Sequence, residues 1–210
     1  MLAETPHGVW LLPVKAPGQA QQVVCHGEGP DAWSASGGCA VPIAGEMLRA
    51  VAAAGYSALL AGALERMLTL TLQHANERKQ FGKPIGRFQA IQQQISAMAE
   101  RVIAARMAAQ MGFTDDVLAG RLDSLAVAKA ITSEVVPIAA SVAHAVHGAI
   151  GVTAEFSLQR YSGAAHRWRG AAGGEVHWRR VIGRRVLADR SLPRDFLRTH
   201  LSGTVVQDAF

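Results

Sequence analysis

Lysine is scarce in this chain of 210 residues: only four of its 21 basic residues are lysines, and the rest are arginines. The two cysteines, Cys25 and Cys39, form neither a CxxC pair nor a cluster with histidines at metal-ligand spacing. Long hydrophobic runs are also missing, since no window approaches the ~20 uninterrupted apolar residues of a membrane span. We therefore expect two reduced thiols, no metal site and no membrane association.

The first ten residues lack a basic region before an apolar stretch, so we expect no secretory signal and a cytoplasmic location. Half of the residues are hydrophobic and 18% are charged, which is typical of a folded globular protein. The formal net charge is +5, and many arginines crowd the last third of the chain. Such a surface would suit an anionic partner, but only Trp168 and Trp178 offer aromatic platforms there. We expect a solvated or subunit-facing surface and no nucleic-acid binding.

The first 44 residues differ from the rest of the chain in proline content and in the length of their apolar runs. They hold five of the eight prolines, and their short apolar runs predict strands over Val9–Val14, Gln21–His26 and Ala32–Val41. So few strands cannot close a sheet with two buried faces. Residues 1–44 are therefore predicted to be a short β segment, part of a larger β-domain.

From Gly45 onward the apolar residues recur near the 3.6-residue period of a helix. Two glycines and a proline within residues 80–86 forbid a continuous helix there. We expect helices from 45 to that break, over 87–111, from 114 to 147 with a kink at Pro137, and over 154–167 and 174–188. The predicted fold class is mainly α, with residues 45–210 forming an antiparallel helical bundle.

Two segments carry a resemblance to a known family. Residues 77–92, ERKQFGKPIGRFQAIQ, place an Arg, then Phe-Gly, Pro-Ile and Phe-Gln-x-Ile-Gln between two long predicted helices. This pattern resembles the signature of the acyl-CoA dehydrogenase family. Residues 147–155, HGAIGVTAE, resemble the family's Gln-x-His-Gly-Gly-x-Gly-x-Thr-x-Glu segment. The resemblance covers residues 45–190 as the C-terminal helical domain and 1–44 as the tail of the middle β-domain; the family's remaining parts have no counterpart here.

The resemblance implies an FAD-dependent α,β-dehydrogenation of an acyl-CoA thioester. By the match, Arg78 would contact the diphosphate of an FAD held by a neighbouring subunit, because a guanidinium fork suits phosphate oxygens. Gln80 would donate from the same loop, Phe81 would pack on the nucleotide, and Ile85 with Gln89 would complete the contact. The alternatives are structural: Arg78 neutralises a helix C-terminus, Phe81 fills a corner between helices, and Gln89 is solvated.

The catalytic carboxylate of the family has no match. The two positions at which the resemblance places it fall on Ala52 and on residues 171–174, none of which is acidic. Glu175 and Glu46 are the nearest candidates for a catalytic base. Glu175 lies where the family often carries a separate acid, and Glu46 is at the start of a predicted helix, where an acid complements the helix dipole.

The second segment also departs from the pattern. The family's glutamine falls at Ala145 and its second glycine at Ala149, so a hydrogen-bond partner is missing and a methyl group is added. His144 and His147, three residues apart, could share a face; without a third ligand we expect a structural role rather than a metal site.

Three hypotheses remain open. The first is a subunit or half of a bacterial acyl-CoA dehydrogenase that resembles the base-less chain of a heteromeric member. The second is an active dehydrogenase lacking its N-terminal part, with Glu46 or Glu175 as the base. The third is a flavin-free helical scaffold or interaction protein that kept the fold. Because the first long helix carries apolar residues on more than one face, we expect a homo-oligomer or a hetero-oligomer with a second chain of the family.

Overall fold

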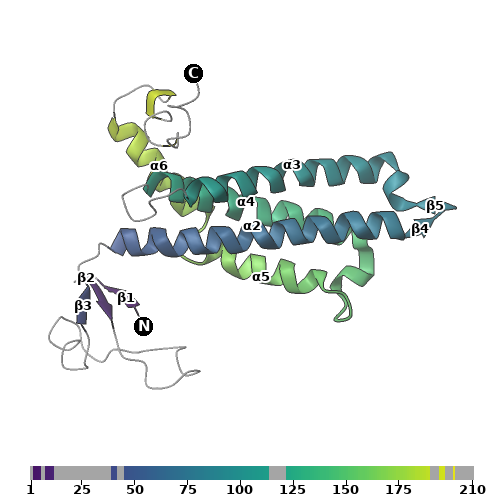
Figure 1. The fold of residues 1–210 in the computed structure, drawn as a ribbon, viewed down its shortest axis with the longest axis horizontal. Coiled ribbons are helices and arrows are strands. Elements are labelled where there is room, and N and C mark those ends of the chain that lie inside the picture. The colour runs from purple at the N-terminus through teal and green to yellow at the C-terminus, as the bar shows by residue number, and fades with distance from the viewer. Residues whose placement is uncertain are drawn as a thin grey trace. The chain divides into compact units, whose positions relative to one another are not determined.

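The computed structural model describes residues 2–5, 8–11, 39–41, 45–113, 122–189, 194–196 and 201. The chain divides into two compact units, Met1–Arg49 and Ala50–Phe210, which are described separately below. Five helices dominate the described residues, so the predicted mainly α fold class is confirmed (Figure 1).

The first unit contains a three-stranded antiparallel sheet in the order β1-β2-β3, with strands Leu2–Thr5, Gly8–Leu11 and Cys39–Val41. Val9 of β2 pairs with Val41 of β3. The predicted strand at 9–14 matches β2 over its described residues, whereas β1 was not predicted. The predicted strand at 21–26 lies outside the described residues, as do 32–38 of the third. Cys39 is an exposed free thiol, and Cys25 lies outside the described residues.

The helices lie where the periodicity and the glycines predict them. They are α2 (Gly45–Glu77), α3 (Gln89–Gly112), α4 (Leu122–His147), α5 (Leu158–Gly170) and α6 (Glu175–Asp189). Helix α4 continues through Pro137, and the predicted N-terminal cap at 114–116 lies outside the described residues. Helix α5 begins four residues later than predicted and extends to Gly170, because a 3-10 turn (η2, Gly148–Val152) and a bend precede it.

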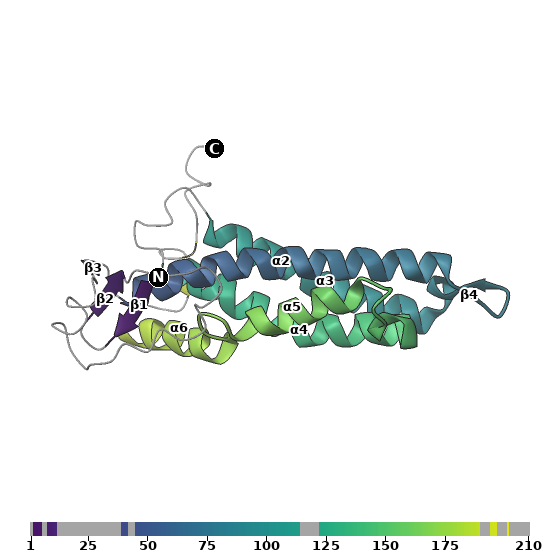
Figure 2. The same cartoon turned by 90° about the horizontal axis from the view of Figure 1, so that it is seen from below.

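The core of the second unit lies between α2, α3, α4 and α5, which run side by side in Figures 1 and 2. Its members are large apolar side chains from α2 and α3 set against small ones from α4. Alanines at 139 and 143 of α4 let the neighbouring helices approach closely. The residues that pack here include Leu60, Leu64, Met67, Met98, Val102, Val136, Ala139, Ala143 and Leu158.

A buried lysine fastens α5 to α4. Lys129 is fully buried, and its ammonium donates to the Trp168 carbonyl at 3.2 Å, the Arg169 carbonyl at 2.7 Å and Ser133 Oγ at 2.7 Å. These carbonyls belong to the last turn of α5, where a helix has no internal donors left. Burial lowers the pKa of Lys129 to about 8.

Ion pairs attach α6 to α4. Arg185 donates to the buried carboxylate of Asp123, with 3.1 Å from Nη2 to Oδ2, and Arg179 pairs with Glu134. The indole of Trp178 is fully buried, and its Nε1 donates to the Ala172 carbonyl at 3.0 Å. Several of the arginines in the last third of the chain therefore serve the packing of its helices.

Two helices are long and apolar enough to cross a membrane by length and composition alone: Met47–Glu77 and Leu122–Val152. The core helices of a soluble bundle pass the same test. Both helices supply the core described above, and α4 also buries Lys129, Thr132 and Ser133 against its neighbours. The prediction of no membrane association stays a prediction.

Candidate functional site

The break between α2 and α3 is a short hairpin whose tip is strained. Strands β4 (Lys79–Gln80) and β5 (Lys83–Pro84) pair antiparallel around Phe81 and Gly82, which have φ of +51° and +77°. Left-handed φ at both central residues is the turn that joins two twisted strands in two residues. A bulky side chain in this region is unusual and costs on the order of 1 kcal/mol. The sequence places Phe81 there nonetheless.

The ring of Phe81 lies on the surface of the protein. It is 90% exposed, and its only described ring contact is edge-on to Phe88, with 6.1 Å between the ring centroids. The Lys83 ammonium lies over the other ring of this pair, 4.4 Å from the centroid of Phe88. A strained, exposed aromatic residue that contributes little burial points to a contact outside its own chain.

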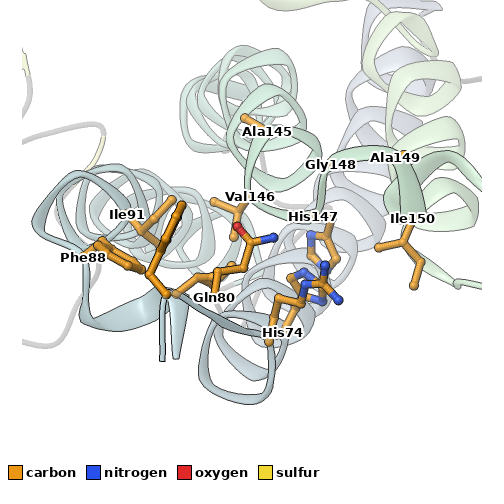
Figure 3. A pocket seen from close by; sticks show the side chains of 13 residues that line it. His74, Gln80, Phe88, Ile91, Ala145, Val146, His147, Gly148, Ala149 and Ile150 are labelled. Carbon is orange, nitrogen blue, oxygen red and sulfur yellow. The ribbon is translucent and has the colours of Figure 1, made fainter. Parts of the chain in front are cut away.

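Beside the hairpin lies a cavity of about 560 Å³. Helix α2 and the hairpin contribute His74, Arg78, Gln80 and Phe81. Ile85 of the 3-10 turn η1 (Ile85–Arg87), Phe88 just before α3, and Ile91 of α3 continue this wall. The second wall is residues 145–150, at the junction of α4 and η2. Figure 3 shows these three groups of side chains facing a common space. The two sequence segments that carry the resemblance, far apart in the chain, thus meet at one cavity.

Four of the five predicted cofactor-contacting residues line this cavity: Arg78, Gln80, Phe81 and Ile85. The fifth, Gln89, does not line it; it is exposed at the first residue of α3. Arg78 remains close to the end of α2, since its backbone N–H donates to the His74 carbonyl at 2.9 Å. The cavity wall therefore carries a guanidinium, an amide and aromatic surface, which are groups that bind a nucleotide diphosphate.

The departures from the family pattern also fall on this wall. Ala145 and Ala149 both line the cavity and are exposed. Gly148 has φ of +64°, which ends α4 and turns the chain along the wall. Gly151 cannot be replaced freely, because a Cβ there would lie 2.9 Å from the Cβ of His147 and 3.2 Å from Leu158 Cδ2.

Two histidines in the wall were not predicted as a pair. The rings of His74 and His147 stack with 4.5 Å between centroids, and Phe156 packs against His147 at 4.9 Å. Burial lowers the pKa of both imidazoles, helped at His74 by the neighbouring His147 and Arg78. The only sequence signal for His74 is its position one helical turn before Arg78.

His144 does not share a site with His147. Its Nε2 lies 2.9 Å from the hydroxyl of Ser162 on α5. Among the residues that the structure describes, no group of three or more His, Cys, Asp or Glu side chains is arranged to hold a metal ion.

The two candidate bases lie elsewhere. Glu175 begins α6, which lies at the opposite end of the bundle from the hairpin (Figure 1), and it is engaged by Arg169. The hydrogen bonds from Arg169 lower the pKa of Glu175, which makes it a weaker base. Glu46 is the second residue of α2, and its side chain lies outside those described. A catalytic role for either stays a prediction.

The sequence model of the C-terminal domain of acyl-CoA dehydrogenases matches residues 46–187, well over half of the chain. The chain belongs to the acyl-CoA dehydrogenase family. The matched residues contain all five helices but for the ends of α2 and α6, and both walls of the cavity.

Relatives and solved structures agree with this assignment. The acyl-CoA dehydrogenase IpdE2 of Mycolicibacterium smegmatis is 34% identical over 105 residues, 50% of this chain and 32% of the relative. A glutaryl-coenzyme A dehydrogenase bound to glutaryl-CoA superposes with a TM-score of 0.64 at 30% identity, over 69% of this chain and 37% of its own. The ChsE4-ChsE5 complex from Mycobacterium tuberculosis gives 0.63 at 31% identity, over 69% and 40%. The chain thus spans about a third of the length of these acyl-CoA dehydrogenases.

Proposed function

We propose that this chain is one part of an FAD-dependent acyl-CoA dehydrogenase, and that its hairpin cavity contacts the nucleotide half of an FAD shared with a neighbouring subunit. The observation that carries the proposal is the meeting of Arg78 and Phe81 with residues 145–150 around one open cavity. Family membership supports it, because both walls belong to the matched domain.

The residues present fit the nucleotide part of FAD. Arg78 offers a fork of N–H donors to diphosphate oxygens, and Gln80 offers an amide. Phe81 presents a ring that is 90% exposed and touches Phe88 only at its edge. Of the basic side chains of the hairpin, Arg78 lines the cavity, whereas Lys79 and Lys83 flank the turn and do not line it. When bound, FAD would accept a hydride from the substrate.

The same residues do not supply a base for that chemistry. Proton abstraction next to a thioester carbonyl needs a carboxylate positioned at the carbon atom. Position 52 and residues 171–174 lack one, and Glu175 is paired with Arg169. We propose that the base comes from a partner chain. The ChsE4-ChsE5 complex, to which this chain is similar, joins two different chains, which supports a hetero-oligomer.

Apolar side chains on the outside of the bundle support an oligomer as well. Leu59 on α2 is 49% exposed, and Ile103 and Met107 on α3 are 55% and 60% exposed. Exposed apolar surface of this kind is typical of helices that another chain covers. We propose a dimer or a larger oligomer, formed either by copies of this chain or with a second acyl-CoA dehydrogenase-like chain.

Flavin binding is the decisive test. The purified chain is titrated with FAD, and binding is followed by the change in flavin fluorescence. We expect Arg78→Gln to weaken binding at least tenfold, since a hydrogen bond to a charged group contributes ~1.5–3 kcal/mol. Arg66→Gln is the matched control, because Arg66 is exposed on α2, the helix that Arg78 follows, and does not line the cavity.

Two results would contradict the proposal. FAD that fails to bind at any concentration favours a flavin-free helical scaffold of the same fold. Equal loss of binding in both arginine variants shows that general charge, rather than the cavity, attracts the flavin.

Dehydrogenase activity separates the partner hypothesis from an unorthodox base. With an acyl-CoA and an artificial electron acceptor, the chain alone is expected to be inactive. Activity that appears only after a second chain of the family is added supports a base supplied by that partner. Activity of the chain alone that is lost in Glu175→Gln or Glu46→Gln would instead make that residue the base.

A further inference from the structure

The His74–His147 pair joins the cavity to the interior of the bundle. Both histidines line the cavity: His74 on α2 is half-buried, and His147 at the end of α4 is only 5% exposed. The two rings stack at an interplanar angle of 22°. Phe156 covers His147 from the turn before α5, so the buried ring is enclosed by aromatic and apolar groups.

The hydrogen bonds of His147 fix its tautomer. Its Nδ1 lies 2.7 Å from the Ala143 carbonyl, and a carbonyl only accepts, so the proton is on Nδ1. Its Nε2 is buried and has no hydrogen-bond partner. Because the proton is on Nδ1, the free lone pair of the ring is on Nε2. This nitrogen is the position at which His147 can take up a second proton.

The charges around the pair decide how many protons it holds. Burial is the largest effect and opposes a charge on either ring. His147 and Arg78 also oppose a charge on His74, and Glu77 favours one. At His147, backbone contacts with Ala143 and Leu70 favour a charge and His144 opposes it. Two cations with 4.5 Å between ring centroids would repel each other strongly in a half-buried site. The pair therefore accepts one proton at most.

We infer that the His74–His147 pair takes up one proton when a diphosphate group enters the cavity, and so supplies a second positive charge beside Arg78. This inference rests on the proposed function, in which the cavity contacts a nucleotide diphosphate. A diphosphate diester carries two negative charges, and Arg78 alone balances one of them. A proton from solvent on the pair balances the other. No covalent bond forms or breaks in this step.

Proton-linked binding is measured with ADP-ribose, whose diphosphate is a diester and does not titrate near neutral pH. Calorimetric titrations near pH 7 use two non-anionic buffers of different ionisation enthalpy, so that the apparent heat reports the protons taken up. We expect uptake of up to about one proton and an affinity that falls as the pH rises through the histidine range. For one proton taken up, the affinity falls by at most about tenfold for each pH unit.

His74→Phe is the main variant, because it keeps a ring on His147 and removes the titratable nitrogen. Binding through Arg78 should persist, but proton uptake should fall and its pH dependence should shift, because only His147 is left to take the proton. In the double variant with His147→Gln, whose amide can still donate to the Ala143 carbonyl, proton uptake and the pH dependence should disappear. His74→Gln serves as a second variant if the first is poorly folded. The control is His166→Gln, at an exposed position on α5 that does not line the cavity, which should behave as wild type.

The possible outcomes separate this inference from the proposed function. FAD and ADP-ribose that bind without proton uptake, or an unchanged pH dependence in the double variant, overturn the inference and leave the flavin proposal standing. ADP-ribose that binds with His74-dependent proton uptake while FAD does not bind supports the inference and overturns the flavin proposal. Failure of both ligands to bind overturns both.

Discussion

Two hydrogen bonds from the guanidinium of Arg169 to the carboxylate of Glu175 join the two ends of the loop between α5 and α6. Nε of Arg169 donates to Glu175 Oε2 at 3.2 Å, and Nη2 donates to Oε1. Between them Ala172 has a left-handed φ of +54°. The carboxylate that lies nearest to the family's catalytic position thus holds a strained loop closed.

Glu175→Gln is therefore expected to destabilise the fold. Because the pair is partly exposed, the loss should be about 1 kcal/mol, or roughly 2–4 °C in Tm for a domain of this size. Arg169 lowers the pKa of Glu175, so the carboxylate stabilises the folded state above its usual pKa and loses this effect as the pH falls through the lowered value. The difference between wild type and variant should shrink in acid.

Thermal unfolding followed by circular dichroism, near neutral pH and in acid, measures this difference. Glu100→Gln, an exposed position on α3, is the matched control and should leave Tm unchanged. A destabilisation that grows in acid would contradict the role given to the ion pair.

Lys129→Met tests the buried clamp between α4 and α5. The methionine fills a similar volume but removes the ammonium donor from the Trp168 and Arg169 carbonyls, which keep only the weaker hydrogen bonds from the Ala171 N–H and the Ser133 hydroxyl, both at 3.2 Å. The loss of these charge-assisted hydrogen bonds should cost about 1.5–3 kcal/mol. We expect a clear loss of stability at neutral pH. Lys79→Met in the exposed hairpin is the control and should have little effect.

The loss of stability caused by Lys129→Met should grow as the pH rises. The pKa of Lys129 is about 8 in the folded chain and 10.5 ordinarily, so between these values the unfolded state binds more protons. Stability of the wild type therefore rises with pH across this window, and the variant lacks that contribution. Urea unfolding at several alkaline pH values measures the trend, which a flat difference would contradict.

The sequence predicted the helices and half of the cavity, because both depend on residues close together in the chain. The apolar period locates α2 and α3, and Gly82, Pro84 and Gly86 locate the corner between them. Arg78 and Phe81 then reach one cavity because a tight hairpin brings them there. Gln89 does not line the cavity, because a residue one position after Phe88 is rotated about 100° around the helix. Its predicted contact with the cofactor stays a prediction.

The histidine pair depends on contacts that the sequence does not encode locally. His74, His147 and Phe156 come from three elements, and their rings meet only after α2 packs against α4 and the chain turns before α5. Strand β1 was missed for a different reason. Its four residues are too few for an alternating pattern to be distinguished from a loop.

Phe81→Gly separates function from stability at the hairpin tip. Glycine adopts a φ of +51° without strain, and the exposed ring contributes little burial, so the free energy of unfolding should change by less than about 1 kcal/mol. Flavin affinity should nevertheless fall by about tenfold, as expected for a lost aromatic contact of ~1–3 kcal/mol. Unchanged affinity in fluorescence titrations would remove Phe81 from the binding surface.

Ala145→Gln should add a hydrogen-bonding side chain to the cavity wall. Position 145 is exposed and lines the cavity, so the longer side chain can enter without disturbing the core. Its amide would add one hydrogen bond to the bound nucleotide, worth ~0.5–1.5 kcal/mol, or about a twofold to tenfold gain in FAD affinity. Ala104→Gln, on the exposed face of α3, is the control for a general effect of added amide and should bind as wild type. Equal gains in both variants, or weaker binding in Ala145→Gln alone, would show that the nucleotide does not pass along residues 145–150.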